Sequence, residues 1–185
     1  MNKDWYKPYD SPEELYVSWY LDELGEAGYV IQVDFHPDSY RLSPQVKYKR
    51  YKMLKTKIKE IPSTLLQEHI YTPDFLVYWT QEAVSIFFKG TGGPFFPDMQ
   101  TEILQRTIWE VKPPFDRNNM TRLFTINQKW VYDKYGVYVQ KIIPQKLFRD
   151  TFTPQRYLLT DSGKQKRKLI FAPKTLEEYV ESRKG

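Results

Sequence analysis

Three residues on two strand-like segments have the types and spacing that phosphodiester chemistry requires. Asp74 enters the apolar run at 75–79, and Glu110 and Lys112 stand two residues apart on a later apolar segment. Residues i and i+2 of a strand project from one face, so Glu110 and Lys112 point the same way. If the two strands are neighbours, Asp74 lies beside Glu110. Two carboxylates suit Mg²⁺, which takes oxygen ligands, and an adjacent ammonium can act on an attacking water or offset charge at a phosphate.

The Glu-x-Lys spacing is specific within this chain. No acidic residue other than Glu110 is followed two positions later by lysine. Pro-Asp pairs occur three times, but only the pair at 73–74 leads into a run rich in aromatic and β-branched residues, and the pairs at 37–38 and 97–98 have turn-like and loop-like surroundings. The alternative interpretation is that Asp74 caps a turn and that Glu110 and Lys112 form an exposed pair on an edge strand.

An amphipathic helix is predicted near the start of the chain. Ser11 suits the N-cap, Pro12 the first helical position and Glu14 the N3 position of a capping box. Glycine at 25 or 28 can end the helix. Glu14 shares a face with apolar residues spaced by three and four. It either caps the helix start and faces solvent or leans toward the other carboxylates as a further acidic group.

These motifs together resemble the PD-(D/E)XK nuclease superfamily. Ser-x-x-Glu at 11–14, Tyr-Thr-Pro-Asp-Phe at 71–75 and Glu-Val-Lys at 110–112 are most similar to phage endonuclease I type Holliday-junction resolvases and related small phage nucleases. The resemblance spans residues 11–143. It implies an α/β fold, in which a central mixed β-sheet is flanked by helices in a restriction-endonuclease-like core.

The same resemblance implies an activity and a site. Glu14, Asp74 and Glu110 would be metal ligands and catalytic residues of a DNA endonuclease, and Lys112 would complete the catalytic set. Mg²⁺ is the implied cofactor, with Mn²⁺ as a substitute. Branched DNA is the implied substrate in recombination, and cutting both arms of a junction implies a homodimer. The alternatives are a nuclease acting on DNA ends or flaps, and a DNA-binding or packaging protein without turnover.

Two departures from the family pattern concern the linking segments. Asp74 and Glu110 are 36 residues apart, so residues 80–107 are expected to be an insertion, with 84–89 as an extra strand. Lys112 is followed by two prolines, which end the strand and cannot donate to a ladder. Neither departure removes a proposed ligand.

A basic segment at 44–61 is the predicted DNA contact. Its cations, interleaved with Tyr48 and Tyr51, are Lys47, Lys49, Arg50, Lys52, Lys55, Lys57 and Lys59. Basic side chains with aromatic stacking surfaces are typical of nucleic-acid binders, although a solvated basic face is the alternative. Periodicity does not decide between strand and helix here.

A second helix is predicted from the start signal at 116–119 to about Tyr135, with Leu123, Ile126 and Trp130 on its buried side and Val131 as a further candidate. Gln128 and Tyr132 share a helix face. Their spacing resembles a helix motif of the exonuclease branch of the same superfamily, where it helps to position DNA, and a solvated face is the alternative. A strand is expected at 137–143.

Residues 144–185 are expected to form a C-terminal extension of the 1–143 core. A hairpin at 159–171 and a helix at 175–183 are predicted. Its basic residues are Lys164, Lys166, Arg167 and Lys168. The extension could wrap the core, contact DNA or bind a partner.

The composition of the chain limits which folds, metal sites and locations are expected. The 185 residues suffice for one domain with a substantial core, and the net charge is +5. There is no cysteine and there are two histidines, which argues against structural zinc and a cysteine nucleophile. No apolar run is long enough to span a bilayer, so we expect no membrane partner and a cytoplasmic location, in the host cell if the protein is phage-encoded.

Overall fold

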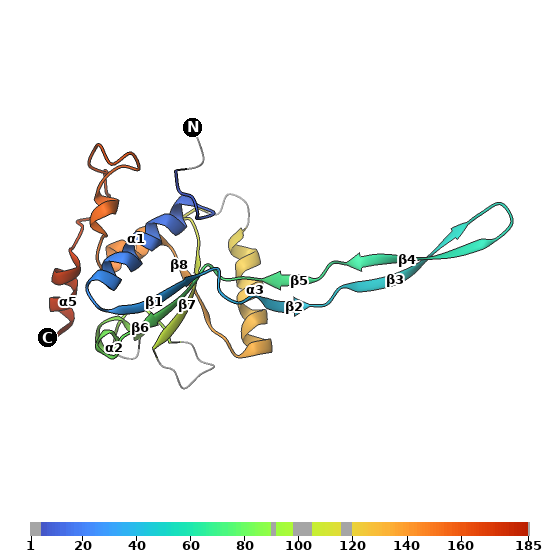
Figure 1. The fold of residues 1–185 in the computed structure, drawn as a ribbon, viewed down its shortest axis with the longest axis horizontal. Helices are drawn as coiled ribbons and strands as arrows, with labels where there is room; N and C mark the ends of the chain where they lie inside the picture. The colour runs from blue at the N-terminus through green and yellow to red at the C-terminus, as the bar shows by residue number, and fades with distance from the viewer. Residues whose placement is uncertain (1–4, 90–91, 98–104, 116–119, 185) are drawn as a thin grey trace.

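The computed structural model describes residues 5–89, 92–97, 105–115 and 120–184 (Figure 1). Its centre is a mixed four-stranded sheet of order β1-β6-β7-β8. The strands are β1 (Val30–Phe35), β6 (Phe75–Trp79), β7 (Arg106–Val111) and β8 (Val139–Ile142). The first three run antiparallel and β8 runs parallel to β7. Helices cover both faces, so the predicted α/β class is confirmed.

One face of the sheet carries the larger core. The helices packed there are α1 (Pro12–Glu26), α2 (Gln81–Phe87), α4 (Pro144–Asp150), the 3₁₀ helix η2 (Gln155–Leu158) and α5 (Leu176–Lys184). Tyr20 of α1 stacks on Phe148 and Phe152, with ring centroids 5.8 and 4.2 Å apart, and its hydroxyl lies 3.1 Å from the Thr151 hydroxyl. Residues 144–184 therefore contribute directly to the core around α1.

The opposite face carries a smaller core. Helix α3 (Met120–Tyr135) connects the parallel strands β7 and β8, which need such a crossover. The short strands β2 (Tyr40–Ser43) and β5 (His69–Tyr71) pack on the same side. Leu42, Ile108 and Val131 are among its buried residues.

A long two-stranded ribbon leaves the body of the molecule from β2 and β5 (Figure 1). It consists of β3 (Val46–Met53) and β4 (Ile58–Leu66), joined by a turn in which Leu54 N donates to Lys57 O at 2.8 Å. Every residue of β3 is exposed. The basic segment is thus an antiparallel hairpin, called the ribbon (residues 46–66) below.

Three local predictions are wrong. Residues 84–89 do not form a strand, because Ala83, Ile86 and Phe87 are buried with the three-to-four spacing of α2. In α3, Leu123 and Ile126 are about half exposed, and the buried stripe runs one position later. It consists of Phe124, Asn127 and Val131. The predicted hairpin at 159–171 is wrong in extent: an antiparallel bridge joins Leu159 to Lys166, and the flanking hydrogen bonds run from Thr160 N to Gln165 O and from Arg167 N to Leu158 O, each at 2.7 Å.

The other predicted elements agree with the structure. Helix α1, strands β6, β7 and β8 and helix α5 lie where the sequence places them, within a few residues. The loop at 97–98 and the helix-start signal at 116–119 fall wholly or partly outside the described residues.

Candidate active site and metal-binding cluster

Asp74 and Glu110 face each other across two central strands. Phe75 pairs with Trp109 in the antiparallel β6–β7 ladder, and the ladder continues as Asp74 N donates to Trp109 O at 3.0 Å. Asp74 Oδ2 accepts a hydrogen bond from Val111 N at 2.6 Å. The backbone of β7 therefore fixes the Asp74 carboxylate beside Glu110.

Glu110 is buried and bonded on both carboxylate oxygens. Its Oε2 accepts the Tyr71 hydroxyl at 2.7 Å, and its Oε1 lies 2.5 Å from Lys112 Nζ. The side chains of Glu110 and Lys112 are only 9% and 14% exposed. Because β7 is an inner strand, the alternative of an exposed pair on an edge strand is wrong.

The pKa of Asp74 reflects its burial and the charged groups around it. Burial, the Glu110 carboxylate and then Glu14 raise the pKa of Asp74 from 3.8 to about 8, while the Val111 N–H and Lys112 oppose the rise. Burial and the Glu110 charge also raise the pKa of Tyr71. Glu14, Glu110 and Lys112 thus all influence the Asp74 carboxyl, and among these four residues the acidic groups outnumber the ammonium by three to one.

Glu14 caps its helix. Its backbone N–H donates to Ser11 Oγ at 3.2 Å, its Oε1 accepts from Ser11 Oγ at 2.6 Å, and its Oε2 accepts from Asp10 N at 3.0 Å. The cap is therefore confirmed, but Glu14 is buried and does not face solvent as that interpretation expected. A carboxylate has about four acceptor positions, so these bonds leave room for a cation.

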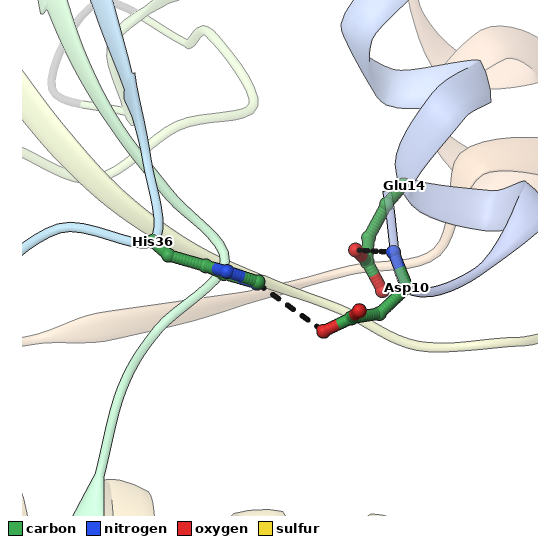
Figure 2. A group of neighbouring side chains, drawn as sticks. All are labelled: Asp10, Glu14 and His36. Atoms are coloured by element: carbon green, nitrogen blue, oxygen red, sulfur yellow. Dashed lines mark hydrogen bonds and ion pairs between the residues drawn. The ribbon is translucent and has the colours of Figure 1, made fainter. Parts of the chain in front are cut away.

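Glu14 also belongs to a cluster that could hold a metal ion (Figure 2). Asp10, Glu14 and His36 each place one ligand atom within 4.8 Å of the others. His36 Nε2 lies 3.6 Å from Asp10 Oδ2. Asp10 directly precedes α1 and His36 directly follows β1, so the cluster joins the helix start to the end of an outer strand.

His36 connects this cluster to Asp74. It adopts the left-handed backbone conformation, with φ of 49°, and its N–H donates to Asp74 O at 2.9 Å. A hollow of about 680 Å³ opens beside it, lined also by Asp34, Asp38 and Arg106. Within the described residues, the trio Glu14, Asp74 and Glu110 is not gathered as tightly as Asp10, Glu14 and His36. The trio as a ligand set stays a prediction.

The two residues of the predicted helix motif line one open pocket, and Gln128 also makes a structural hydrogen bond. Gln128 Nε2 donates to Val139 O at 2.6 Å and so ties α3 to β8. Tyr132 is half exposed and lines an open pocket of about 440 Å³ with Phe96, Lys129 and Tyr138.

The predicted basic contacts also differ in availability. On the ribbon, Lys47, Lys49, Arg50, Lys52, Lys55 and Lys57 are exposed. In the C-terminal segment Lys164, Lys166 and Lys168 are exposed. Arg167 instead donates to Tyr157 O and Asp161 and lies over the rings of Tyr16 and Tyr157, so its guanidinium has a structural role.

Sequence reasoning assigned no role to Tyr71, Asp10 or His36. Tyr71 stands inside the Tyr-Thr-Pro-Asp-Phe motif, and its position three residues before Asp74 is the signal that could have drawn attention to it. Asp10 and His36 meet only through the packing of α1 beside β1. No local spacing in the sequence predicts that contact.

No family model matches the chain, and no curated protein or solved structure matches it either. The resemblance to the PD-(D/E)XK superfamily therefore stays a prediction. Over the described part of the chain, none of the helices combines the length and apolarity needed to cross a membrane.

Proposed function

We propose that this chain is a Mg²⁺-dependent DNA endonuclease that hydrolyses phosphodiester bonds. The observation that carries the proposal is the group of buried Glu110 and partly buried Asp74 and Lys112, with two carboxylates on neighbouring strands and an ammonium 2.5 Å from one of them. Structural ion pairs seldom gather two carboxylates in one buried place, because the like charges repel. A divalent cation would remove that repulsion.

Asp74 and Glu110 would hold the ion, with Glu14 as a further carboxylate. Oxygen ligands suit Mg²⁺, and Mn²⁺, which accepts both oxygen and imidazole nitrogen, would substitute for it. His36 would contact only the softer ion. Bound there, a divalent ion supplies charge for the phosphate oxygens and lowers the pKa of a water.

Lys112 would act on the attacking water or on the phosphate. Its Nζ is held by Glu110 Oε1, and its backbone N–H donates to Ile142 O at 2.8 Å, so both ends of the residue are fixed. A positioned ammonium stabilises the charge that develops on phosphate oxygens in the transition state. Tyr71 keeps the other Glu110 oxygen in place and serves as a positioning residue.

The proposed substrate is DNA, and branched DNA in particular. The basic ribbon supports DNA as the polyanion, and the resemblance to endonuclease I type resolvases supports a branch and a homodimer that cuts two arms. Such an enzyme would work in the cytoplasm, where a phage-encoded protein would meet replicating DNA.

The test is nicking of supercoiled plasmid by the purified protein. We expect relaxed and linear products with Mg²⁺ or Mn²⁺ and none with EDTA, and faster cutting of a four-way junction than of a linear duplex of equal length. Asp74→Asn, purified in parallel, is the matched control, because it changes one oxygen to nitrogen. Absence of cutting with either ion, or equal cutting by the Asn variant, would refute the proposal.

A further inference from the structure

The net positive charge of the molecule resides in the ribbon. Residues 46–66 contain seven of the 28 basic residues and one of the 23 acidic residues, so this segment carries +6 and the remainder of the chain −1. Neither hydrophobic core includes a residue of the ribbon. A projecting, charged element without a packing role is accounted for by a partner of opposite charge.

The two faces of the ribbon are not equivalent. Residues paired across an antiparallel ladder share a face. Arg50 pairs with Ile61, and Lys52 pairs with Lys59, so these cations lie on one face together with Tyr48. That face carries no acidic residue.

The other face is more apolar and partly neutralised. Lys47 and Lys49 lie on it with Tyr51, Met53, Ile58 and Glu60. Lys49 Nζ is 2.7 Å from Glu60 Oε1. The face of Arg50, Lys52 and Lys59 is therefore the stronger attractor of phosphates.

The ribbon also has a fixed starting point relative to the candidate active site. Tyr71, whose hydroxyl bonds Glu110, pairs with Tyr40 at the base of the ribbon. Val46 is six residue steps from Tyr40 and Met53 is thirteen. At about 3.3 Å per residue, the ribbon covers distances of roughly 20 to 40 Å from that base.

We propose that the face carrying Tyr48, Arg50, Lys52 and Lys59 lies in the major groove of duplex DNA, roughly 6 to 12 base pairs from the phosphate that is cut. The distance of roughly 20 to 40 Å is converted to base pairs with a rise of about 3.4 Å per base pair. A major groove about 12 Å wide admits a two-stranded β-ribbon. The distance to the cut rests on the proposed nuclease function, whereas the binding of duplex DNA by the ribbon does not. The substrate class is therefore a branch flanked by about one helical turn of intact duplex.

The first experiment measures affinity against duplex length. Four-way junctions with arms of 4, 8, 12 and 16 base pairs are titrated with the non-cleaving Asp74→Asn protein. We expect affinity to rise by at least about tenfold between 4 and 12 base pairs and then to level off, as phosphate contacts along the ribbon are completed. Equal affinity for all four arm lengths would overturn the proposal.

The matched control removes the ribbon alone. Gln45 Nε2 donates to Gln67 Oε1 at 3.0 Å, so the two ends are adjacent and an Asn-Gly turn can join residue 45 to residue 67. This variant should keep the fold and lose the dependence on arm length. Protection of guanine N7 from dimethyl sulfate, 6 to 12 base pairs from the branch, should also disappear. Persistence of either signal in the shortened protein would overturn the proposal.

Two double variants test the face. One variant combines Arg50→Gln with Lys52→Gln on the proposed DNA face. The other combines Lys47→Gln with Lys49→Gln on the opposite face. Both remove two positive charges from β3. The first pair should lower the slope of log affinity against log salt by about 1.8, and the second by less than half of that. Equal losses would overturn the assignment of the face.

Two further outcomes separate this inference from the proposed function. Binding that depends on arm length, without cleavage by the wild type in Mg²⁺ or Mn²⁺, would support the ribbon and refute the nuclease. Cleavage together with binding that does not depend on arm length would support the nuclease and refute the role of the ribbon. If removal of the ribbon turned a dimer into a monomer with unchanged DNA affinity, its partner would be a second copy of this chain and the DNA assignment would fall.

Discussion

The candidate active site and the ribbon use charge in opposite ways. Glu110 and Tyr71 are buried and Lys112 is largely buried, and each is held by a hydrogen bond of 2.7 Å or less. The ribbon's cations are exposed, and Lys49 has one carboxylate partner at 2.7 Å. One region fixes a few charges in position, whereas the other spreads many charges over a surface.

This difference predicts how each region responds to substitution. Removal of one buried partner leaves the other charge uncompensated at low dielectric, so single changes there have large effects. Exposed cations act on a polyanion nearly in proportion to their number, because each neutralised phosphate releases counterions. Single changes on the ribbon should therefore be mild and cumulative.

The largest loss of cleavage is expected from replacing the carboxylates Asp74 and Glu110. Asp74→Ala and Glu110→Ala should each reduce cleavage of a junction to the detection limit, because each removes a proposed metal ligand, while DNA affinity stays within a few-fold of wild type. A gel assay measures cleavage, and titration in Ca²⁺ measures DNA affinity, so a loss of catalysis can be distinguished from a loss of binding. Normal cleavage by either variant would contradict its assignment.

Lys112→Gln should come next. The amide keeps length and hydrogen-bonding ability but loses the charge that acts in the transition state, so single-turnover cleavage should fall by about 10²–10⁴. The measurement uses saturating protein, so that weak binding cannot appear as a slow rate. A loss confined to affinity would make Lys112 a phosphate contact.

The ribbon should show a loss of affinity instead. Replacing Lys47, Lys49, Arg50 and Lys52 together by Gln should flatten the salt dependence of binding by about 1.8 to 2.7 in slope, most of it from Arg50 and Lys52. Thermal stability should change little, because these residues are exposed. An unaltered slope would move the DNA path elsewhere, with the exposed lysines at 164, 166 and 168 as the next candidates.

Tyr71→Phe should have a moderate effect. It removes the hydroxyl that holds Glu110 Oε2, and loss of a residue that orients a metal ligand typically costs about 10- to 100-fold in metal affinity. The concentration of Mg²⁺ or Mn²⁺ that gives half-maximal cleavage measures this. The maximal rate at saturating metal should recover; a rate that stays low would indicate a role in the chemistry itself.

The smallest effect concerns stability and pH. The pKa of Asp74 is about 8 in the folded protein and 3.8 is its ordinary value, so between these limits the folded state binds more protons than the unfolded state. Stability in EDTA should therefore fall as pH rises from about 4 to about 8, by several degrees of melting temperature at about 2–4 °C per kcal/mol. Asp74→Asn should flatten the trend. A melting temperature that rises with pH, equally in both proteins, would contradict the assignment.

Much of the geometry of the candidate active site could be predicted from the sequence, because period-two patterns fix which side chains share a strand face. Glu110 and Lys112 lie together for that reason, and the apolar run after Asp74 correctly indicated a strand. Their partners Tyr71, Asp10 and His36 come from other elements. Those contacts depend on long-range packing, which local spacing does not encode.

The failures in the fold have similar causes. In α3 the apolar residues at 123 and 126 and the buried residues at 124 and 131 form neighbouring stripes, and the packing against the sheet selects one of them. The segment at 47–59 fitted both helix and strand periods. Its turn at 54–57 is what resolves the choice, since pairing with β4 gives β3 its hydrogen bonds.

The stacking of Tyr20 on Phe148 and Phe152 has a consequence for synthesis on the ribosome. Helix α1, which carries Glu14, is made before residues 148–152, and it lacks these core contacts until they have left the exit tunnel. Domains complete their folding as cooperative units. Nascent chains that already contain Asp74 and Glu110 should therefore still lack a properly anchored Glu14, so the acidic site is completed only late in translation.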